Sequence, residues 1–190
     1  FLGFLEPTSG LAMVNGVDIT NDIKAVRQAT AYLPEAATLY EHLSAYENLE
    51  YFLSLAKVKA SRSDIDAALD RVSLQTDARG KRLSTYSKGM RQKVAIGLAL
   101  LRKTQILLLD EPTSGLDPIA IDEFNTLVRS LADEGRTILM VTHDVYGACQ
   151  VADRIGLLRK GDLVGAFDRP EGGLIDTGAV HAAFAGRTAA

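Results

Sequence analysis

The chain has 190 residues, of which 47% are apolar and 24% are charged, and its mean hydropathy is +0.05. Such a chain can bury one substantial core, and its longest apolar run falls short of the roughly 18 residues that a membrane-spanning helix needs. The formal net charge of −3 comes without a basic block, so no nucleic-acid surface is indicated. The single cysteine, Cys149, excludes an internal disulfide, is typical of a reducing compartment and is interpreted as a packed side chain.

The first third of the chain predicts short elements. Phe1–Leu5 is apolar and predicts the end of a helix, which a turn at residues 6–10 follows. Because the chain begins inside this apolar stretch and without a methionine, we expect an N-terminal portion to be missing. Residues 11–19 predict two strands joined by a hairpin at Asn15-Gly16, and residues 29–33 predict a further short strand.

Three helices are predicted between residues 44 and 102. Ser44 and Glu47 have the spacing of a capping box, and apolar residues follow on one face. A second apolar face follows Ser63. The third helix begins near Ser87 and ends at about Arg102, and we expect its apolar second half to be buried.

The remaining residues alternate between strand and helix patterns. Asp117 and Pro118 have the residue types of a helix start, and Gly135 that of a helix end. Strands are predicted over residues 106–109, 137–141, 155–158 and 163–167, a loop over 170–173, and a short helix over 176–184. This alternation predicts an α/β fold with a mostly parallel sheet and an inserted helical lobe.

Two adjacent carboxylates, Asp110 and Glu111, directly follow the apolar strand pattern, and a third, Asp117, follows a Pro/Gly turn. Ligands of open α/β sheets bind beyond the carboxyl ends of the strands. Two acids at that place suit a hydrated divalent cation and a water molecule to be activated. Taken alone, the same residues also fit a core strand with a capped turn.

Several local patterns occur in a fixed order, and together they resemble the nucleotide-binding cassette of ABC transporters from about residue 6 to residue 164. The patterns are Tyr32-Leu33-Pro34-Glu35, Tyr86-Ser87-Lys88-Gly89-Met90-Arg91-Gln92, Leu107-Leu108-Leu109-Asp110-Glu111, Ser114-Gly115-Leu116-Asp117 and His143. The resemblance implies a P-loop NTPase (RecA-like) α/β fold, with a mostly parallel sheet core and an inserted α-helical subdomain, in which the N-terminal sheet and Walker A portion are missing.

The resemblance also implies a subdivision of the chain. Residues 1–35 would be a remnant of the core and the antiparallel β region, and residues 36–104 the helical subdomain with the signature motif. Residues 105–167 would form the core with Walker B, D-loop and switch histidine, and residues 168–190 a C-terminal tail.

At the Walker B strand, the resemblance implies that Asp110 holds Mg²⁺ through water, because this ion dehydrates reluctantly. Glu111 would orient or deprotonate the water that attacks the γ-phosphate of ATP. His143 corresponds to the switch histidine that contacts the same phosphate. His42 and His181 lie in no motif, and no role is predicted for them.

Ser87, Lys88, Gly89 and Met90 correspond to the signature motif, with Ser-x-Gly in place of the usual Ser-Gly-Gly. A hydroxyl and a small residue at a helix N-terminus offer free N–H groups to an anion. In this family the phosphate belongs to the nucleotide of the opposite subunit, so the resemblance implies a dimer. Asp117 corresponds to the D-loop, which crosses the dimer interface. Both serine and aspartate are also common helix N-caps, and that alternative stays open.

Glu35 occupies the Q-loop position, where glutamine is usual. A carboxylate there can still bind Mg²⁺ or its waters beside the nucleotide. Some exporter-type cassettes carry glutamate at this position, so the difference favours that branch. Residues 36–43 would then face the coupling helix of a membrane partner.

The phosphate cradle Gly-x-x-x-x-Gly-Lys does not occur in the 190 residues. In this family it lies upstream and supplies most of the phosphate binding. We expect either a truncated sequence or a natural remnant. We also expect the chain by itself to bind ATP poorly and to hydrolyse none measurably.

The leading hypothesis is an ATP-binding and ATP-hydrolysing subunit that powers an ABC-type membrane transporter, with ATP and Mg²⁺ as cofactors. The expected partners are an integral-membrane permease and a second ATP-binding subunit, at the cytoplasmic face of the cell membrane, and no nucleic acid is expected. The first alternative is a soluble ABC ATPase of DNA repair or of the ribosome, although such proteins carry coiled-coil, zinc-bearing or tandem-cassette insertions that this sequence lacks. The second is a non-catalytic subunit, which would have no chemical need for Asp110, Glu111 and His143.

Overall fold

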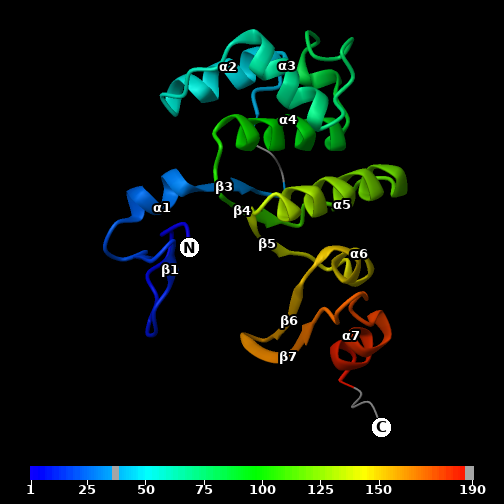
Figure 1. The fold of residues 1–190 in the computed structure, drawn as a ribbon. Helices are drawn as coiled ribbons and strands as arrows, with labels where there is room; N and C mark the ends of the chain where they lie inside the picture. The colour runs from blue at the N-terminus through cyan, green and yellow to red at the C-terminus, as the bar shows by residue number, and fades with distance from the viewer. Residues whose placement is uncertain (36–38, 187–190) are drawn as a thin grey trace. The chain divides into compact units, whose positions relative to one another are not determined.

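The computed structural model describes residues 1–35 and 39–186 (Figure 1). The chain divides into two compact units, Phe1–Pro112 with Gly135–Met140 and Thr113–Glu134 with Val141–Ala190. The first three residues of the segment predicted to face a membrane partner, 36–38, lie outside the described residues. The predicted boundaries at residues 35/36, 104/105 and 167/168 stay predictions.

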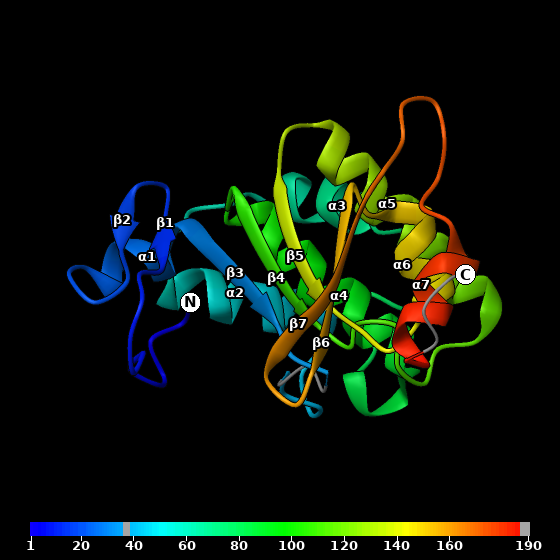
Figure 2. The same cartoon turned by 90° about the horizontal axis from the view of Figure 1, so that it is seen from below.

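The sheet of the first unit positions the candidate acids. Its strand order is β3-β4-β5, with β3 at Thr30–Leu33, β4 at Ile106–Asp110 and β5 at Thr137–Val141 (Figure 2). β3 and β4 run parallel, with Tyr32 opposite Leu108. The amide of Thr137 donates to the carbonyl of Gln105 at 3.0 Å, so β4 and β5 begin at the same end of the sheet. The three strands predicted from the sequence are confirmed.

Alternate residues of β3 and β4 lie on opposite faces of the sheet, as the pleat of a strand requires. One face is apolar and buried, and it consists of Ala31, Leu33, Leu107 and Leu109. Together with Ala95, Ile96 and Ala99 of α4 (Lys88–Leu101), these residues line a small cavity. The opposite face carries Tyr32, Leu108 and Asp110, which are exposed or half-buried. The buried face therefore fixes the strands, while the other face presents polar groups.

The N-terminal residues form a hairpin and one short helix. The hairpin pairs β1 (Met13–Val14) with β2 (Val17–Asp18), and its turn has positive φ at Asn15 and Gly16, as the sequence predicted. Helix α1 (Ile23–Ala29) was not predicted, and its N-cap, Asp22, accepts a hydrogen bond from Ala25 N at 2.9 Å. A helix of two turns carries too few apolar positions for its periodicity to stand out.

The helix end predicted at Phe1–Leu5 is wrong, because the segment is irregular. Gly3 has φ +68°, in the left-handed region that does not continue a right-handed helix. The guanidinium of Arg27 lies 5.6 Å from the ring centroid of Phe4, and its Nε donates to the carbonyl of Leu2 at 3.0 Å. These contacts with α1 take the place of helical hydrogen bonds.

The predicted helical lobe is present, and capping decides where its helices begin. It contains α2 (Ala45–Leu55), α3 (Arg62–Arg71), the 3₁₀ turn η1 (Leu83–Thr85) and α4. The capping box of Ser44 and Glu47 is confirmed, with backbone amides donating to the side chains in both directions at 3.2 and 2.7 Å. Helix α3 begins earlier than its apolar face suggested, because Ser61 and Asp64 form a second capping box.

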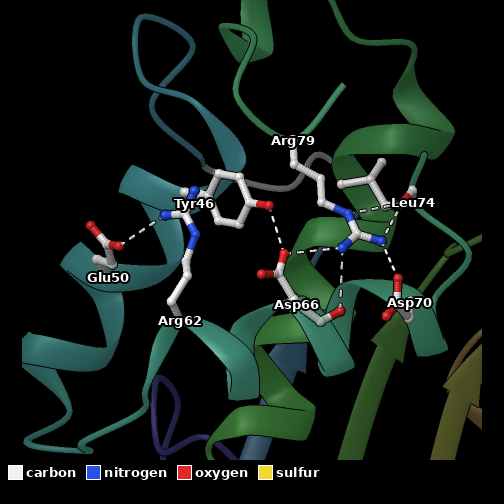
Figure 3. A network of polar contacts seen from close by, with 7 residues as sticks. All are labelled: Tyr46, Glu50, Arg62, Asp66, Asp70, Leu74 and Arg79. Carbon is white, nitrogen blue, oxygen red and sulfur yellow. Dashed lines mark hydrogen bonds and ion pairs between the residues drawn. The ribbon is translucent and has the colours of Figure 1, made fainter. Parts of the chain in front are cut away.

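A buried arginine connects these helices (Figure 3). The side chain of Arg79 is 4% exposed and binds the carboxylates of Asp66, at 3.1 Å, and Asp70, both on α3. Its Nε and Nη2 donate to the carbonyl of Leu74 at 3.1 and 2.9 Å. Tyr46 of α2 donates to the same Asp66 at 2.6 Å. Arg79 thus ties α2 and α3 to the segment that leads into α4.

In the described part of the second unit, three helices pack with one hairpin. Its elements are α5 (Pro118–Asp133), α6 (Val145–Val151), β6 (Arg154–Arg159), β7 (Asp162–Asp168) and α7 (Thr177–Phe184). β6 and β7 pair antiparallel, as predicted, whereas the short α6 was not predicted. Cys149 is fully buried in a core with Leu157, Ile175 and Val180, which confirms its packed role. Among the described residues, no helix combines the length and apolar character that crossing a membrane requires.

Substitution of Arg79 tests the role of this network in the lobe. We expect Arg79→Met to lower the free energy of unfolding by about 1–3 kcal/mol, because it leaves the carbonyl of Leu74 without its donors. Arg79→Lys keeps the charge but cannot bind two carboxylates and a carbonyl together, so it should also destabilise the protein. Urea unfolding followed by circular dichroism measures both effects.

Lys81→Met is the matched control, because the Lys81–Asp77 pair is exposed on both sides and such pairs contribute about 0–1 kcal/mol. Unfolding midpoints of both Arg79 variants within error of the parent would contradict the assigned role.

Candidate functional site

The backbone takes an unusual conformation at the end of β4. Asp110 is the last residue of the strand, and Glu111, which follows it, has φ +46°. The other described non-glycine residues with positive φ lie in hairpin turns or directly after helices, and they are Asn15, Lys57, Ser73, Lys103 and Lys160. Such conformations are common in turns but costly elsewhere, and they cluster at functional sites. The strained position of Glu111 thus coincides with the acid pair.

Tyr32 is a neighbour of the acid pair that the sequence analysis did not single out. Its hydroxyl donates to Oδ2 of Asp110 at 3.1 Å. Desolvation, the hydrogen bond to Asp110 and the negative charge of that carboxylate all raise the pKa of Tyr32, so the hydroxyl keeps its proton. The available signal was its position on the short strand predicted over residues 29–33, but only the register with β4 reveals the contact.

Asp110 has the donor type that Mg²⁺ prefers. The described residues contain no cluster of three or more His, Cys, Asp or Glu side chains that could hold a metal. Mg²⁺ is usually held by one or two carboxylates together with water and substrate phosphates, and not by an all-protein cage. A half-buried carboxylate at a strand end, with one oxygen fixed by Tyr32, fits that mode of binding.

Ser87 is the N-cap of α4, and its hydroxyl accepts a hydrogen bond from Met90 N at 3.2 Å. The cap interpretation is therefore confirmed. Lys88, Gly89 and Met90 form the first turn, where the leading amides of any α-helix have no acceptor within the helix. Binding of an anion by this turn stays a prediction.

The segment before α4 is hydrogen-bonded to residues that follow the predicted Q-loop. The amides of Leu83 and Ser84 donate to the carbonyls of Leu43 and Glu41 at 2.9 and 2.8 Å. The guanidinium of Arg91 donates to the carbonyl of Leu83 and forms an ion pair with Glu41 at 3.0 Å. The start of the signature helix is thus held against residues 41–43.

Glu35 and Lys88, two predicted site residues, are brought together by the fold. The Nζ atom of Lys88 lies 3.8 Å from Oε1 of Glu35, and both side chains are more than a third exposed. An exposed pair of this kind contributes little stability. The pair matters because it shows that the Q-loop position and the signature motif lie next to each other within one unit.

Asp117 and His143 belong to the second unit. Asp117 is the N-cap of α5, and its Oδ1 accepts from Ala120 N at 2.9 Å, so its cap interpretation is also confirmed. His143 is exposed and lies between β5 and α6. The N-cap of α6 is Asp144, and a Cβ on Gly147 would lie 2.2 Å from its Oδ2, so a larger residue at position 147 would displace the capping carboxylate.

Residues 1–114 match the family described as ABC transporter. The chain therefore belongs to the ABC transporter family, as its motifs predicted. It is 32% identical over 163 residues to the uncharacterized ABC transporter ATP-binding protein YdbJ of Bacillus subtilis (strain 168), which covers 85% of this chain and 52% of that protein. It is 35% identical over 161 residues to the bacitracin transport ATP-binding protein BcrA of Enterococcus faecalis, which covers 83% and 51%. The chain thus spans about half the length of these relatives.

The structure is similar to that of cbiO1 from Clostridium perfringens, which is part of the ABC transporter complex cbiONQ. The TM-score is 0.76 at 26% identity, over 87% of this chain and 68% of the other. The predicted fold class, an α/β P-loop ATPase cassette with inserted helices, is confirmed. The roles of the individual site residues stay predictions.

Substitutions at Ser87 separate its cap from its predicted contact with phosphate. We expect Ser87→Ala to destabilise the protein by about 1 kcal/mol, because the amide of Met90 loses its acceptor, whereas Ser87→Asp keeps an equally good cap. Thermal unfolding should therefore show a lower midpoint for the alanine variant only.

If Ser87 also binds phosphate, Ser87→Asp in the complete gene product should nevertheless abolish ATP hydrolysis. The negative charge of the aspartate would repel the phosphate. Full ATPase activity in Ser87→Asp would leave the cap as the one role of this residue.

Proposed function

We propose that the chain is part of an ATPase that powers an ABC-type membrane transporter. It would supply the carboxylate that binds the metal, the residue that activates water, and the signature motif. The observation that carries this proposal is the acid pair Asp110 and Glu111 at the end of a buried parallel strand, with Glu111 in a strained backbone conformation. Membership of the ABC transporter family supports it, as does similarity to a bacitracin transport ATP-binding protein.

Asp110 and Glu111 divide the chemistry of hydrolysis between them. Asp110 would hold the magnesium ion through water, and this ion neutralises charge on the phosphates of bound ATP. Glu111 would orient the attacking water and accept its proton as the oxygen bonds to the γ-phosphorus and the bond to ADP breaks.

The signature residues would act on a nucleotide bound by a second subunit. The hydroxyl of Ser87 and the amides of Lys88 and Gly89, at the N-terminus of α4, would stabilise a γ-phosphate, while the amide of Met90 donates to Ser87 and holds the hydroxyl in place. Two copies, or this chain and a related one, would each complete the site of the other. Asp117 would lie at that interface, and His143 would contact the γ-phosphate.

Glu35, at the Q-loop position, would contribute to metal binding at the site. Its carboxylate can bind the magnesium ion or its waters, and Lys88 offsets part of its charge at 3.8 Å. The hydrogen bonds that the amides of residues 83 and 84 donate to residues 43 and 41 would then couple movement of the Q-loop region to the segment before the signature motif. Glutamate at this place favours an exporter-type transporter.

The phosphate cradle of the site would come from residues other than these 190, in which Gly-x-x-x-x-Gly-Lys does not occur. β5 lies at an edge of the sheet, and its Leu139 and Val141 are 47% and 58% exposed. An edge strand presents unpaired backbone N–H and C=O groups with which another strand can pair. We propose that a strand leading to the cradle pairs there, and that residues 1–190 alone hydrolyse no ATP.

The proposed setting is the cytoplasmic face of the cell membrane. The chain would bind there to a separate integral-membrane permease and to a second ATP-binding subunit. Similarity to cbiO1, a part of the cbiONQ transporter complex, supports such an assembly.

Replacement of Glu111 tests the proposed function. In the complete gene product, Glu111→Gln should lower the rate of ATP hydrolysis by at least about 100-fold, because the amide cannot accept the proton of the attacking water. ATP binding should persist, since the side chain keeps its size and the metal ligand is unchanged. Phosphate release and equilibrium ATP binding measure the two effects.

Glu171→Gln is the matched control, because Glu171 is exposed in the loop after β7 and should leave hydrolysis unchanged. Unchanged hydrolysis in Glu111→Gln would remove Glu111 from the role of general base. Absence of ATP hydrolysis by the unmodified complete gene product would contradict the proposed function.

A further inference from the structure

We infer that Tyr32 is a positioning residue for the metal site: its hydroxyl holds the carboxylate of Asp110 in the orientation that binds Mg²⁺ with ATP. The inference rests on the proposed function, because it assigns Tyr32 a part in the same site. Tyr32 stands in the Q-loop pattern but no role follows for it from the sequence, and its contact with Asp110 is visible only in the folded structure.

The register of the sheet aims Tyr32 at Asp110. Tyr32 lies opposite Leu108 in the parallel pair of β3 and β4, and Asp110 lies two residues further toward the end of β4. Residues two apart on a strand share a face, so the phenol and the carboxylate project from the same side of the sheet. The phenol spans this offset, and its hydroxyl reaches Oδ2 of Asp110 at 3.1 Å.

The strand beneath Tyr32 is firmly held. Its neighbours Ala31 and Leu33 are 8% and 5% exposed on the opposite face of the sheet. A tyrosine side chain has only two rotatable bonds, so the hydroxyl loses little conformational entropy when it binds the carboxylate. One oxygen of Asp110 is thereby fixed by the hydroxyl, and the other can face a metal-bound water.

A role confined to stability does not explain this contact. Tyr32 is 43% exposed and Asp110 is half-buried, so water can replace the hydroxyl without stranding a buried polar atom. Hydrogen bonds that orient metal-ligating groups, in contrast, typically change metal affinity by about 10–100-fold when they are removed. Loss of the hydroxyl should therefore affect metal binding far more than folding.

The test compares ATP binding with Mg²⁺ and with EDTA in the complete gene product that carries Glu111→Gln, in which ATP is not consumed. Calorimetry gives the two dissociation constants, and the ratio of the constant in EDTA to the constant in Mg²⁺ reports the contribution of the metal. Tyr32→Phe should reduce this ratio about tenfold by weakening binding in Mg²⁺ only. Its thermal midpoint in EDTA should equal that of the parent.

Tyr46→Phe is the matched control, because it removes a tyrosine–aspartate hydrogen bond to Asp66 in the helical lobe. Its EDTA-to-Mg²⁺ ratio of dissociation constants should stay at the parental value. A parental ratio in Tyr32→Phe would overturn the inference, and so would an equal loss of affinity in Mg²⁺ and EDTA, which indicates a structural role. Failure of the parent to bind ATP, or binding independent of Mg²⁺, would overturn the proposed function and the inference with it.

Discussion

The parallel pairing of β3 with β4 is the constraint on which the rest of the candidate site depends. Burial of Leu107 and Leu109 on one face fixes β4 in the sheet, and the pleat then turns Asp110 to the other face. The same pairing brings the hydroxyl of Tyr32 to Asp110. A shift of β4 by one residue would turn Asp110 to the apolar face and away from Tyr32, so the register that packs the core also places this acid.

The helical lobe positions α4 through polar contacts as well as through its apolar core. Arg79, which is buried, joins two carboxylates of α3 to the carbonyl of Leu74. Further along the chain, backbone bonds hold residues 83 and 84 against residues 41–43. Both sets of contacts act on the segment that leads into Ser87. The first turn of α4 therefore has a defined position before any anion reaches it.

The elements that could be predicted from the sequence are those whose signal is local. The apolar run before Asp110 and the Ser44–Glu47 capping box each identify an element without knowledge of its neighbours. Helix α1 was missed because it has two turns, and Phe1–Leu5 was misassigned because contacts with Arg27 and not helical bonds order it. The contact between Tyr32 and Asp110 spans 78 residues and depends on strand register, which no local pattern encodes.

The central claim is that the acids at the end of β4 face an ATP molecule whose terminal phosphate also meets a signature helix. A crystal structure of the complete gene product with Glu111→Gln, ATP and Mg²⁺ tests this most directly. The expected result is Asp110 within hydrogen-bond distance of a water bound to the metal, with position 111 beside the γ-phosphate and a Ser87 hydroxyl on the far side of that phosphate. A nucleotide bound away from the end of β4, or a metal held without Asp110, would contradict the claim.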